Sequence, residues 1–364
     1  MWYRITPNDT LFFRDGKPFT MGAESWADII FPPNPSTLYG AIRTWLIFEK
    51  GDLKSFIEGK FREELGTPNE KGKLRIKGPI LFKNGEFLFP LPLDLLKREG
   101  NENNNVLSYL TFSRKPDILI SDYKMDNSLI WKDTEHAESV EGYISAIYLK
   151  NYLSGEGNLG FTEAGDLYIV ETKIGIARDR VTRTAKWGHI YRAPMIRLKE
   201  GVSIAVWIDG ITNIPESGLL QLGGEKKSAK IEKVNDNILE EIENINLQLD
   251  NGLFKVYLAT PSIFENGYLP GWIDPNTFEG SYNRIKVKLV CCVIGKYRLI
   301  GGWDMAKGKP KPMVRAVPAG SVYYFQILDN PSFDRIKETF HFKNISDRYP
   351  EEGYGLSLIG VVRL

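Results

Sequence analysis

The chain has 364 residues, with 47 Lys and Arg against 46 Asp and Glu, so its net charge is close to zero. This length accommodates two domains or one large elaborated domain, and the balanced charge excludes a surface that is basic throughout. No apolar run approaches the ~20 residues of a membrane span, and the N-terminus lacks the apolar core of a signal peptide, so we expect a cytoplasmic protein without a membrane partner. The two cysteines, Cys291 and Cys292, are adjacent, which excludes a disulfide framework and a cysteine-rich zinc site.

The first half of the chain predicts strands around one clear helix. Residues 2–6 are expected to form the first strand. Apolar residues then recur at helical spacing over residues 38–50, which predicts a helix. Two extended segments, residues 74–82 and 86–92, flank an Asn-Gly pair and predict a hairpin.

The second half predicts more strands than helices. The expected strands cover residues 167–177, 191–198, 203–208, 254–259, 285–294 and 323–328, followed by a terminal strand. Residues 218–222 are expected to form a short helical turn, and residues 333–340 a helix. Both halves therefore favour an α+β fold, with two units at residues 1–165 and 166–364. The pattern fits a duplicated ferredoxin-like or RNA-recognition-motif (RRM-like) arrangement with insertions.

The densest positive charge lies between Lys173 and Lys199. This segment holds eight basic residues and one acid, Asp179, so its local net charge is +7. The basic residues are Lys173, Arg178, Arg180, Arg183, Lys186, Arg192, Arg197 and Lys199. Arg meets phosphate bidentately and stacks on bases, and Trp187 and Tyr191 lie among the cations, as in grooves for single-stranded nucleic acid. The alternative is a solvated pair of strands joined by salt bridges.

Two glycine-containing segments are further candidates. Gly353, Gly355 and Gly360 allow a backbone to approach a ligand closely, although a tight turn before an edge strand explains them equally. Residues 301–320 carry four cations against one acid, Asp304, for a net charge of +3. These cations are Lys307, Lys309, Lys311 and Arg315. The segment suits either a phosphate-contacting arm or a docking loop, and a plain solvated loop is the alternative.

Little in the sequence indicates catalysis. The three histidines, His136, His189 and His341, do not occur in metal-binding spacing. The chain contains no GxSxG nucleophile elbow, no GxxxxGK[ST] phosphate loop and no dinucleotide-binding glycine motif. No pair of acids has a spacing that suggests a metal site. We therefore expect no catalytic residue, no metal and no cofactor.

Several motifs occur in an order that carries a family resemblance. They are LFFRDGKPF, PNPSTLYGAIRTWL, KIGIARDRVTRTA, YRAPMIRL, LGGEKK, GGWDMAKGKPKP, VPAGSVYYF and the terminal GYGLSLIG. Together they cover nearly the whole chain. The sequence resembles the RAMP-superfamily proteins that form the third subunit of the Cmr module, the type III-B CRISPR RNA-guided effector complex.

The resemblance implies a fold of two ferredoxin-like units with insertions and a non-catalytic scaffold role in antiviral defence. Such a subunit would hold the 5′ repeat-derived tag of the guide (crRNA) RNA. It would also dock the large polymerase-like subunit and a neighbouring backbone RAMP subunit of the ribonucleoprotein.

The resemblance also assigns residues to these contacts. The tag contacts are Arg178, Arg180, Arg183 and Lys186, joined by Arg192 and Arg197, with Trp187 and Tyr191 as stacking candidates. Gly353, Gly355 and Gly360 would face the RNA backbone. Lys307, Lys309, Lys311 and Arg315 would contact RNA or a neighbouring subunit.

Three alternatives stay open at this point. A guide-RNA-processing endoribonuclease of the same superfamily would need His136 or His189 as general base, whereas such enzymes usually carry a histidine in the first unit and the first 135 residues here have none. The equivalent subunit of a type III-A complex would play a similar role. A docking protein would turn the basic segment toward an acidic partner.

Overall fold

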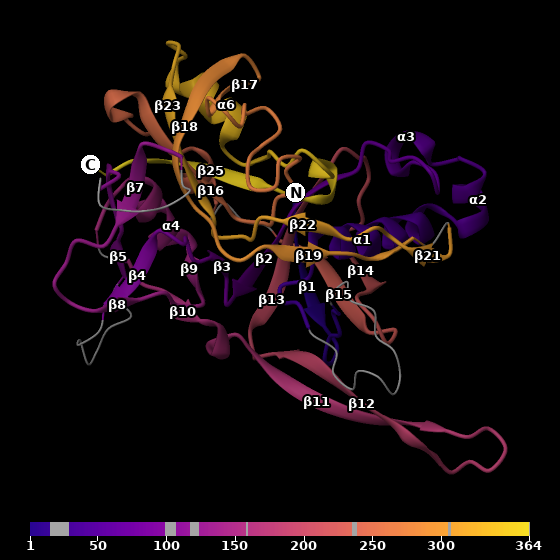
Figure 1. Cartoon of the computed structure of the whole chain (residues 1–364). Helices are drawn as coiled ribbons and strands as arrows, with labels where there is room; N and C mark the ends of the chain where they lie inside the picture. The colour runs from indigo at the N-terminus through magenta and orange to yellow at the C-terminus, as the bar shows by residue number, and fades with distance from the viewer. Residues whose placement is uncertain are drawn as a thin grey trace. The chain divides into compact units, whose positions relative to one another are not determined.

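The computed structural model describes residues 1–14, 29–98, 107–116, 124–157, 159–234, 239–304 and 307–363. The side chains of residues 186–191 lie outside this description, and with them the predicted contacts of Lys186, Trp187 and Tyr191. The fold is mixed α/β, with many strands and few helices (Figure 1). None of the described helices is long and apolar enough to cross a membrane.

The chain forms two compact units, each built from three separate segments. The first comprises Met1–Pro79, Gly165–Val234 and Leu299–Val314, and the second comprises Ile80–Ala164, Asn235–Arg298 and Arg315–Leu364. This division differs from the expected single boundary at residue 165. Long-range strand pairing is the reason, because the N-terminal strand lies between two strands that follow residue 200.

The first unit is organised around one antiparallel sheet. Its strands follow the order β2 (Arg75–Lys83), β13 (Val202–Asp209), β1 (Trp2–Pro7), β15 (Ser228–Lys233) and β14 (Ser217–Gln221). Arg4 of β1 faces Ala205 on one side and Glu232 on the other, which fixes the register. Beyond Pro79, β2 continues into the second unit.

Helix α1 (Pro35–Lys50) confirms the helix that was expected from the apolar spacing. Leu38, Ile42 and Leu46 are fully buried, as the helical period requires. The short helices α2 (Leu53–Ile57) and α3 (Arg62–Leu65) follow it.

The predicted helical turn at residues 218–222 is wrong, because this segment forms strand β14. Gly218 lies so close to the Trp45 indole that a Cβ atom there would come within 2.3 Å of Nε1. An extended glycine next to α1 and pairing with β15 therefore outweigh the local helical pattern.

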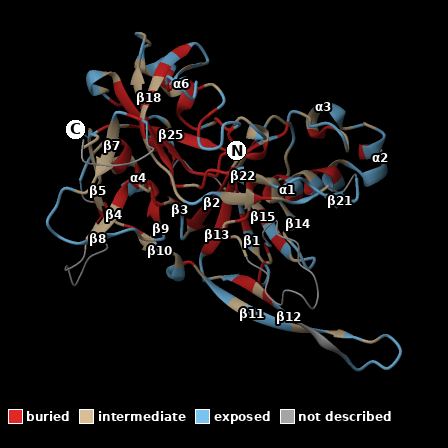
Figure 2. Cartoon of the chain, in the orientation of Figure 1, coloured by how far each residue is buried: buried red, intermediate tan, exposed pale blue. Residues whose placement is uncertain are grey.

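The second unit contains a six-stranded antiparallel sheet. Its order is β17 (Glu279–Tyr282), β18 (Ile285–Val293), β23 (Val322–Ile327), β16 (Leu253–Leu258), β25 (Leu356–Val361) and β24 (Lys343–Asn344). Helix α6 (Phe333–Phe340) confirms the expected helix, and the Ser332 hydroxyl caps it by accepting from the backbone N–H of Arg335 at 3.3 Å. Rings of Phe254, Phe325 and Phe340 pack in the core of this unit, and Figure 2 shows buried residues, in red, around β25.

Smaller elements complete the second unit. The expected hairpin joins the second half of β2 to β3 (Glu86–Pro90), and Asn84 and Gly85 both have positive φ at its turn. The other elements are β4 (Leu95–Arg98), β5 (Leu107–Tyr109), β6 (Thr111–Arg114), β7 (Asn127–Ile130), β8 (Ala137–Glu138), β9 (Gly142–Ser145), α4 (Ala146–Leu153), β10 (Thr162–Glu163) and α5 (Glu240–Glu243). The segment Leu299–Val314 belongs to the first unit instead, and it holds β20 (Trp303–Asp304) and β21 (Lys309–Pro310). Strands β19 (Arg298–Ile300) and β22 (Val314–Ala316) stand at the two ends of this segment and pair with each other.

Candidate nucleic-acid interface

The basic segment forms a long hairpin in the first unit. Strands β11 (Tyr168–Arg178) and β12 (Ala185–Leu198) pair in antiparallel register from Tyr168–Leu198 to Ile176–Ile190, followed by an irregularity before Arg178–Ala185. The hairpin extends beyond the sheet of its unit (Figures 1 and 2). Strand β12 starts earlier than the expected residue 191, because the pairing with β11 continues to the tip.

Arg197, at the base of this hairpin, is held by carboxylates. Its Nη2 lies 3.0 Å from Glu171 Oε2 and 3.3 Å from Asp9 Oδ1, and its Nε also donates to Glu171. Hydrogen bonds from Lys227 and from the backbone of Thr10 lower the pKa of Asp9 to about 2, so this carboxylate stays charged. The positive charge of Arg197 is therefore largely compensated by carboxylates of the same chain. At this position the structure agrees with the alternative given above, a pair of strands joined by salt bridges.

The tip of the hairpin is different, because its single acid is occupied by backbone groups. Asp179 Oδ1 accepts hydrogen bonds from the N–H groups of Val181 and Thr182, both at 2.9 Å, and these bonds lower the pKa of the carboxyl. Arg178 Nε donates to the carbonyl of Arg183 at 3.0 Å. Arg178, Arg180 and Arg183 are exposed, and none of them forms an ion pair with a described residue. The tip therefore presents three uncompensated guanidinium groups.

One face of the hairpin stem is apolar. Val170, Ile174 and Ile176 lie on this face of β11, where Thr172 separates the first two, and they are 53%, 64% and 49% exposed. Arg192 is the cross-strand partner of Ile174 and lies on the same face. Exposed aliphatic groups in a row are unusual on a soluble surface and mark a contact site.

The predicted lysine loop is also exposed, and it belongs to the first unit up to Val314. Lys309 and Lys311 form no ion pair with a described residue, whereas Lys307 lies 3.8 Å from Asp304. Trp303 is 55% exposed and pairs across the strands with Pro310. Arg315, already in the second unit, stacks on the Tyr297 ring at 4.8 Å.

The terminal glycines are buried in the second unit. A Cβ atom on Gly355 would lie 2.5 Å from the Ser346 nitrogen, and one on Gly360 would lie 3.0 Å from the Leu153 backbone. Gly353 and Gly355 also adopt left-handed φ values of 99° and 73°. The protein's own packing therefore uses these glycines, and the RNA contact that the resemblance implies for them stays a prediction.

Next to Gly360 the second unit contains a buried polar cluster that the sequence reasoning missed. Lys255 Nζ lies 3.7 Å from Asp94 Oδ2, and the two side chains are only 2% and 1% exposed. The Tyr152 hydroxyl donates to Asp94 at 2.8 Å and the Tyr324 hydroxyl at 2.5 Å. Burial lowers the pKa of Lys255 to about 8. A lysine within the otherwise apolar strand β16 was the available signal.

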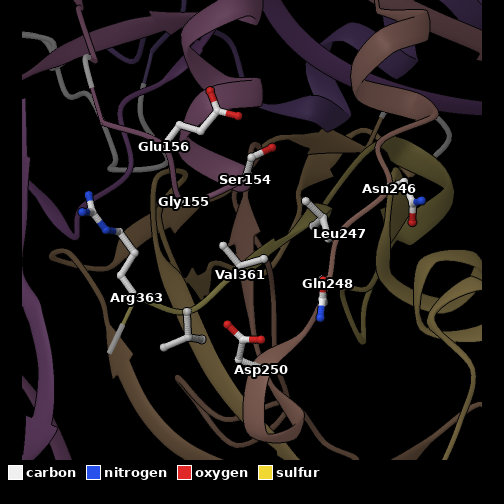
Figure 3. Close-up of a pocket in the computed structure, with 10 residues that line it drawn as sticks. Ser154, Gly155, Glu156, Asn246, Leu247, Gln248, Asp250, Val361 and Arg363 are labelled. Carbon is white, nitrogen blue, oxygen red and sulfur yellow. The ribbon is translucent and has the colours of Figure 1, made fainter.

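A cavity of about 550 Å³ lies in the second unit (Figure 3), and Tyr109 links it to this cluster because the Tyr109 ring contacts both Arg363 of the lining and Lys255. Its lining includes the carboxylates of Glu156 and Asp250 and the guanidinium of Arg363. Arg363 stacks on Tyr109 at 4.8 Å, and the Tyr109 hydroxyl donates to the Glu156 carbonyl at 2.9 Å. Two acids against one cation make this cavity unfavourable for a phosphate group.

The histidines do not assemble a catalytic site among the described side chains. His341 is buried, its Nε2 lies 2.7 Å from the Ile242 carbonyl, and its Nδ1 accepts from the Ile359 N–H at 3.2 Å. Both ring nitrogens are thus engaged by the backbone. His136 is exposed, and the His189 side chain is outside the description. The described residues also contain no cluster of potential metal ligands.

Comparisons of the sequence with known proteins point to one family. The family model described as CRISPR-associated protein (Cas_Cmr3) matches residues 3–362. A curated relative, the CRISPR system CMR subunit Cmr3 of Saccharolobus solfataricus, is 25% identical over 330 residues, which cover 89% of this chain and 86% of the relative.

Solved structures share the fold. Two cryo-EM structures of the type III-B Cmr-beta bound to cognate target RNA contain chains that match with TM-scores of 0.52 and 0.53. Each match has 18% sequence identity and covers 97% of this chain and 95% of the other. One of the two structures also contains AMPPnP.

Proposed function

Because the chain belongs to the Cmr3 family of CRISPR-associated proteins, and is thus a Cmr3 subunit of a type III-B effector complex, we propose that it holds the 5′ tag of the guide RNA. In this role it is a non-catalytic scaffold that also docks the large polymerase-like subunit. The hairpin tip is the observation that carries this proposal, since Arg178, Arg180 and Arg183 are exposed there and form no ion pair with any carboxylate in the part of the chain that the structure describes. Phosphate groups of RNA are the natural counterions for such a cluster, and binding them releases condensed cations.

The apolar stem of the hairpin adds to this proposal. Val170, Ile174 and Ile176 offer a surface against which unpaired bases or a neighbouring subunit can pack. Arg192 lies on the same face and can contact the backbone of the same strand. Arg197 contributes to this interface by fixing the hairpin base through Glu171 and Asp9.

The strand order supports the proposal of two ferredoxin-like units. In that βαββαβ fold the first and third strands lie at the centre of the sheet and the second and fourth flank them. In the first unit β1 and β13 take the central places, with β2 and β15 outside them and α1 as the first helix. In the second unit β16 and β23 are central, with β18 and β25 outside them and α6 as the second helix. Each unit thus keeps one of the two helices.

Further contacts are proposed for the remaining candidates. Lys309 and Lys311 are exposed and uncompensated among the described residues, so they suit RNA or an acidic surface of the neighbouring backbone subunit. The relatives of known structure are chains of Cmr assemblies bound to target RNA, which is consistent with RNA and other Cmr subunits as partners of this chain.

A non-catalytic role is favoured over guide-RNA processing. The engagement of both nitrogens of His341 by backbone groups removes one histidine from consideration as a general base. We expect the isolated chain to leave guide RNA intact with or without divalent metal ions. Reproducible cleavage that is lost in His189→Ala or His136→Ala would support the processing enzyme instead.

The direct test is a salt series of tag-RNA binding with Arg178→Glu combined with Arg183→Glu. We expect the affinity to fall at least tenfold at low salt and the slope of log K against log salt to decrease by at least ~1.4, because each lost contact to single-stranded RNA contributes about 0.7. The matched control is Lys54→Glu with Lys60→Glu, which reverses two exposed cations on and just after α2 of the same unit. Equal affinities of the wild-type and hairpin variants would refute the hairpin as the RNA site.

A further inference from the structure

Strand β14 is the outermost strand of the sheet in the first unit (Figure 1). It pairs with β15 over its whole length, from Ser217–Glu232 to Gln221–Ser228, without a register shift. No other described strand pairs with its second edge. Its outer edge therefore offers backbone groups to a partner.

The hydrogen-bonding direction of each residue follows from the bonds at the two ends of β14. Lys233 N–H donates to the Glu216 carbonyl at 2.7 Å, and Leu222 N–H donates to the Lys227 carbonyl at 2.8 Å. Because antiparallel pairing alternates between bonded and non-bonded positions, Gly218 and Leu220 also bond to β15. The N–H and C=O groups of the three alternate residues, Ser217, Leu219 and Gln221, consequently point away from the sheet.

This edge lacks the features that usually protect edge strands. Natural sheets block lateral pairing with charged side chains, proline, bulges or very short strands. Strand β14 reads Ser-Gly-Leu-Leu-Gln and has none of these, and Leu219 at its centre is 68% exposed. By contrast, the other terminal strands of the two largest sheets are two or four residues long and each carries a charge: β10 has Glu163, β17 has Glu279 and β24 has Lys343.

The edge is also rigid. Gly218 packs against the Trp45 indole of α1, and Leu220 is only 4% exposed. These contacts fix β14 in the extended conformation that an added strand needs, so pairing would cost little ordering of the strand itself.

We propose that β14 is a docking edge for an extended, uncharged segment of another protein subunit of the same complex, which adds to the sheet as a further strand. Main-chain hydrogen bonds to Ser217, Leu219 and Gln221 would give affinity, and an apolar side chain beside Leu219 would give specificity. A polypeptide is favoured over RNA because the edge carries no cation and offers alternating N–H and C=O groups, which an extended backbone matches. Another subunit is favoured over a second copy because the family works in a multi-subunit assembly.

The test uses the full chain with the purified large subunit and the purified adjacent backbone subunit. Amide hydrogen exchange is measured for the free chain and for the assembled complex. We expect the N–H groups of Ser217, Leu219 and Gln221 to exchange quickly in the free chain and to become protected on assembly. Gly218 and Leu220 serve as internal controls, since their N–H groups bond to β15 in both states.

Three variants separate the backbone from the side chain. Leu219→Pro removes only an outward N–H and leaves the bonds to β15 intact, and Leu219→Lys adds an edge charge. Both are expected to weaken assembly at least tenfold while the melting temperature and tag-RNA binding of the isolated chain stay unchanged. Leu219→Thr keeps the N–H and should assemble better than either.

The proposal fails if Leu219→Pro and Leu219→Lys assemble like the wild type, or if residues 217–221 gain no protection in the complex. Full protection in the isolated monomer would show that the chain covers its own edge. Concentration-dependent dimerisation with protection at the same residues would assign the edge to a second copy. Because RNA binding is scored separately, loss of the proposed RNA function would not be confused with any of these outcomes.

Discussion

The buried Lys255 makes a sharp prediction about the pH dependence of stability. Its ammonium is 2% exposed and faces one carboxylate, Asp94, at 3.7 Å. Burial outweighs this attraction and lowers its pKa from 10.5 to about 8. The unfolded chain, with an ordinary lysine, therefore binds the proton more tightly than the folded chain in the interval between these two values.

The sign follows from proton linkage. Where the unfolded state binds more protons, stability rises with pH, so the Lys255 contribution increases as the pH rises above about 8 towards 10.5. Integrated from pH 7 to pH 9.5, this pKa difference corresponds to about 2 kcal/mol. The perturbation is Lys255→Met, which keeps most of the side-chain volume and removes the titrating group.

Urea denaturation at a series of pH values measures the effect. Other groups also bind protons differently in the folded and unfolded chains at alkaline pH. In the folded chain, burial raises the pKa values of Tyr152 and Tyr324 and raises that of Cys292 to about 12. In both proteins the contribution of these groups to stability falls as the pH rises. Tyr152 and Tyr324 share Asp94 with Lys255, so the difference between wild type and Lys255→Met measures the titration of Lys255 together with its coupling to these tyrosines. We expect this difference to shift by about 2 kcal/mol in favour of the wild type.

Lys150→Met is the matched control. The Lys150 ammonium is paired with Glu241 at 2.8 Å, and the pKa of Lys150 is raised, chiefly by this hydrogen bond. Its contribution is therefore constant below its unfolded pKa, and its curve should run parallel to that of the wild type. Parallel curves for Lys255→Met as well would refute the reasoning, because they would show that Lys255 titrates outside this interval.

Two further predictions concern acid stability and glycine packing. Hydrogen bonds from Lys50 and from the Thr212 N–H lower the pKa of Glu64 to about 2, so Glu64→Gln should cost about 1–2 kcal/mol at neutral pH, after allowing for partial exposure. That cost should disappear as the pH falls from about 4.5 towards 2, and thermal melts at both ends check it; a cost that persists in acid would contradict the assignment. Gly355→Ala should destabilise by about 2–4 kcal/mol in urea, because it combines a left-handed φ with a 2.5 Å approach to Ser346. Gly59→Ala is its control, with φ +82° and no atom within 4 Å, and equal costs at the two sites would show that crowding at Gly355 is unimportant.

Local patterns predicted much of the fold. The helix at Pro35–Lys50, the Asn84-Gly85 hairpin and the helix at Phe333–Phe340 all depend on neighbouring residues, so periodicity and turn chemistry were sufficient. The strand at residues 217–221 was missed because its conformation depends on Trp45, which is distant in sequence, and on pairing with β15, which the local pattern did not reveal. The division into two interleaved units was missed for the same reason.

The sequence showed which basic residues make up the candidate segment, but it did not show which of them are paired with acids. The run from Lys173 to Lys199 forms a single hairpin, and its role as an RNA site stays a prediction. Sequence spacing could not show that Asp9, far away in the chain, compensates Arg197, or that Asp179 binds tip amides instead of arginines. The Lys255–Asp94 pair joins residues that only tertiary folding brings together.

The position of β1 between β13 and β15 has a consequence for how the chain folds during synthesis. Arg4 contacts Glu232, 228 positions later in the sequence, so the first strand has neither neighbour until most of the chain has been made. Pairings of such high contact order close large loops and form slowly, and the unpaired strand is exposed in the meantime. A fragment that stops near Asp166 would lack both β13 and β15, and it would not fold as an independent domain.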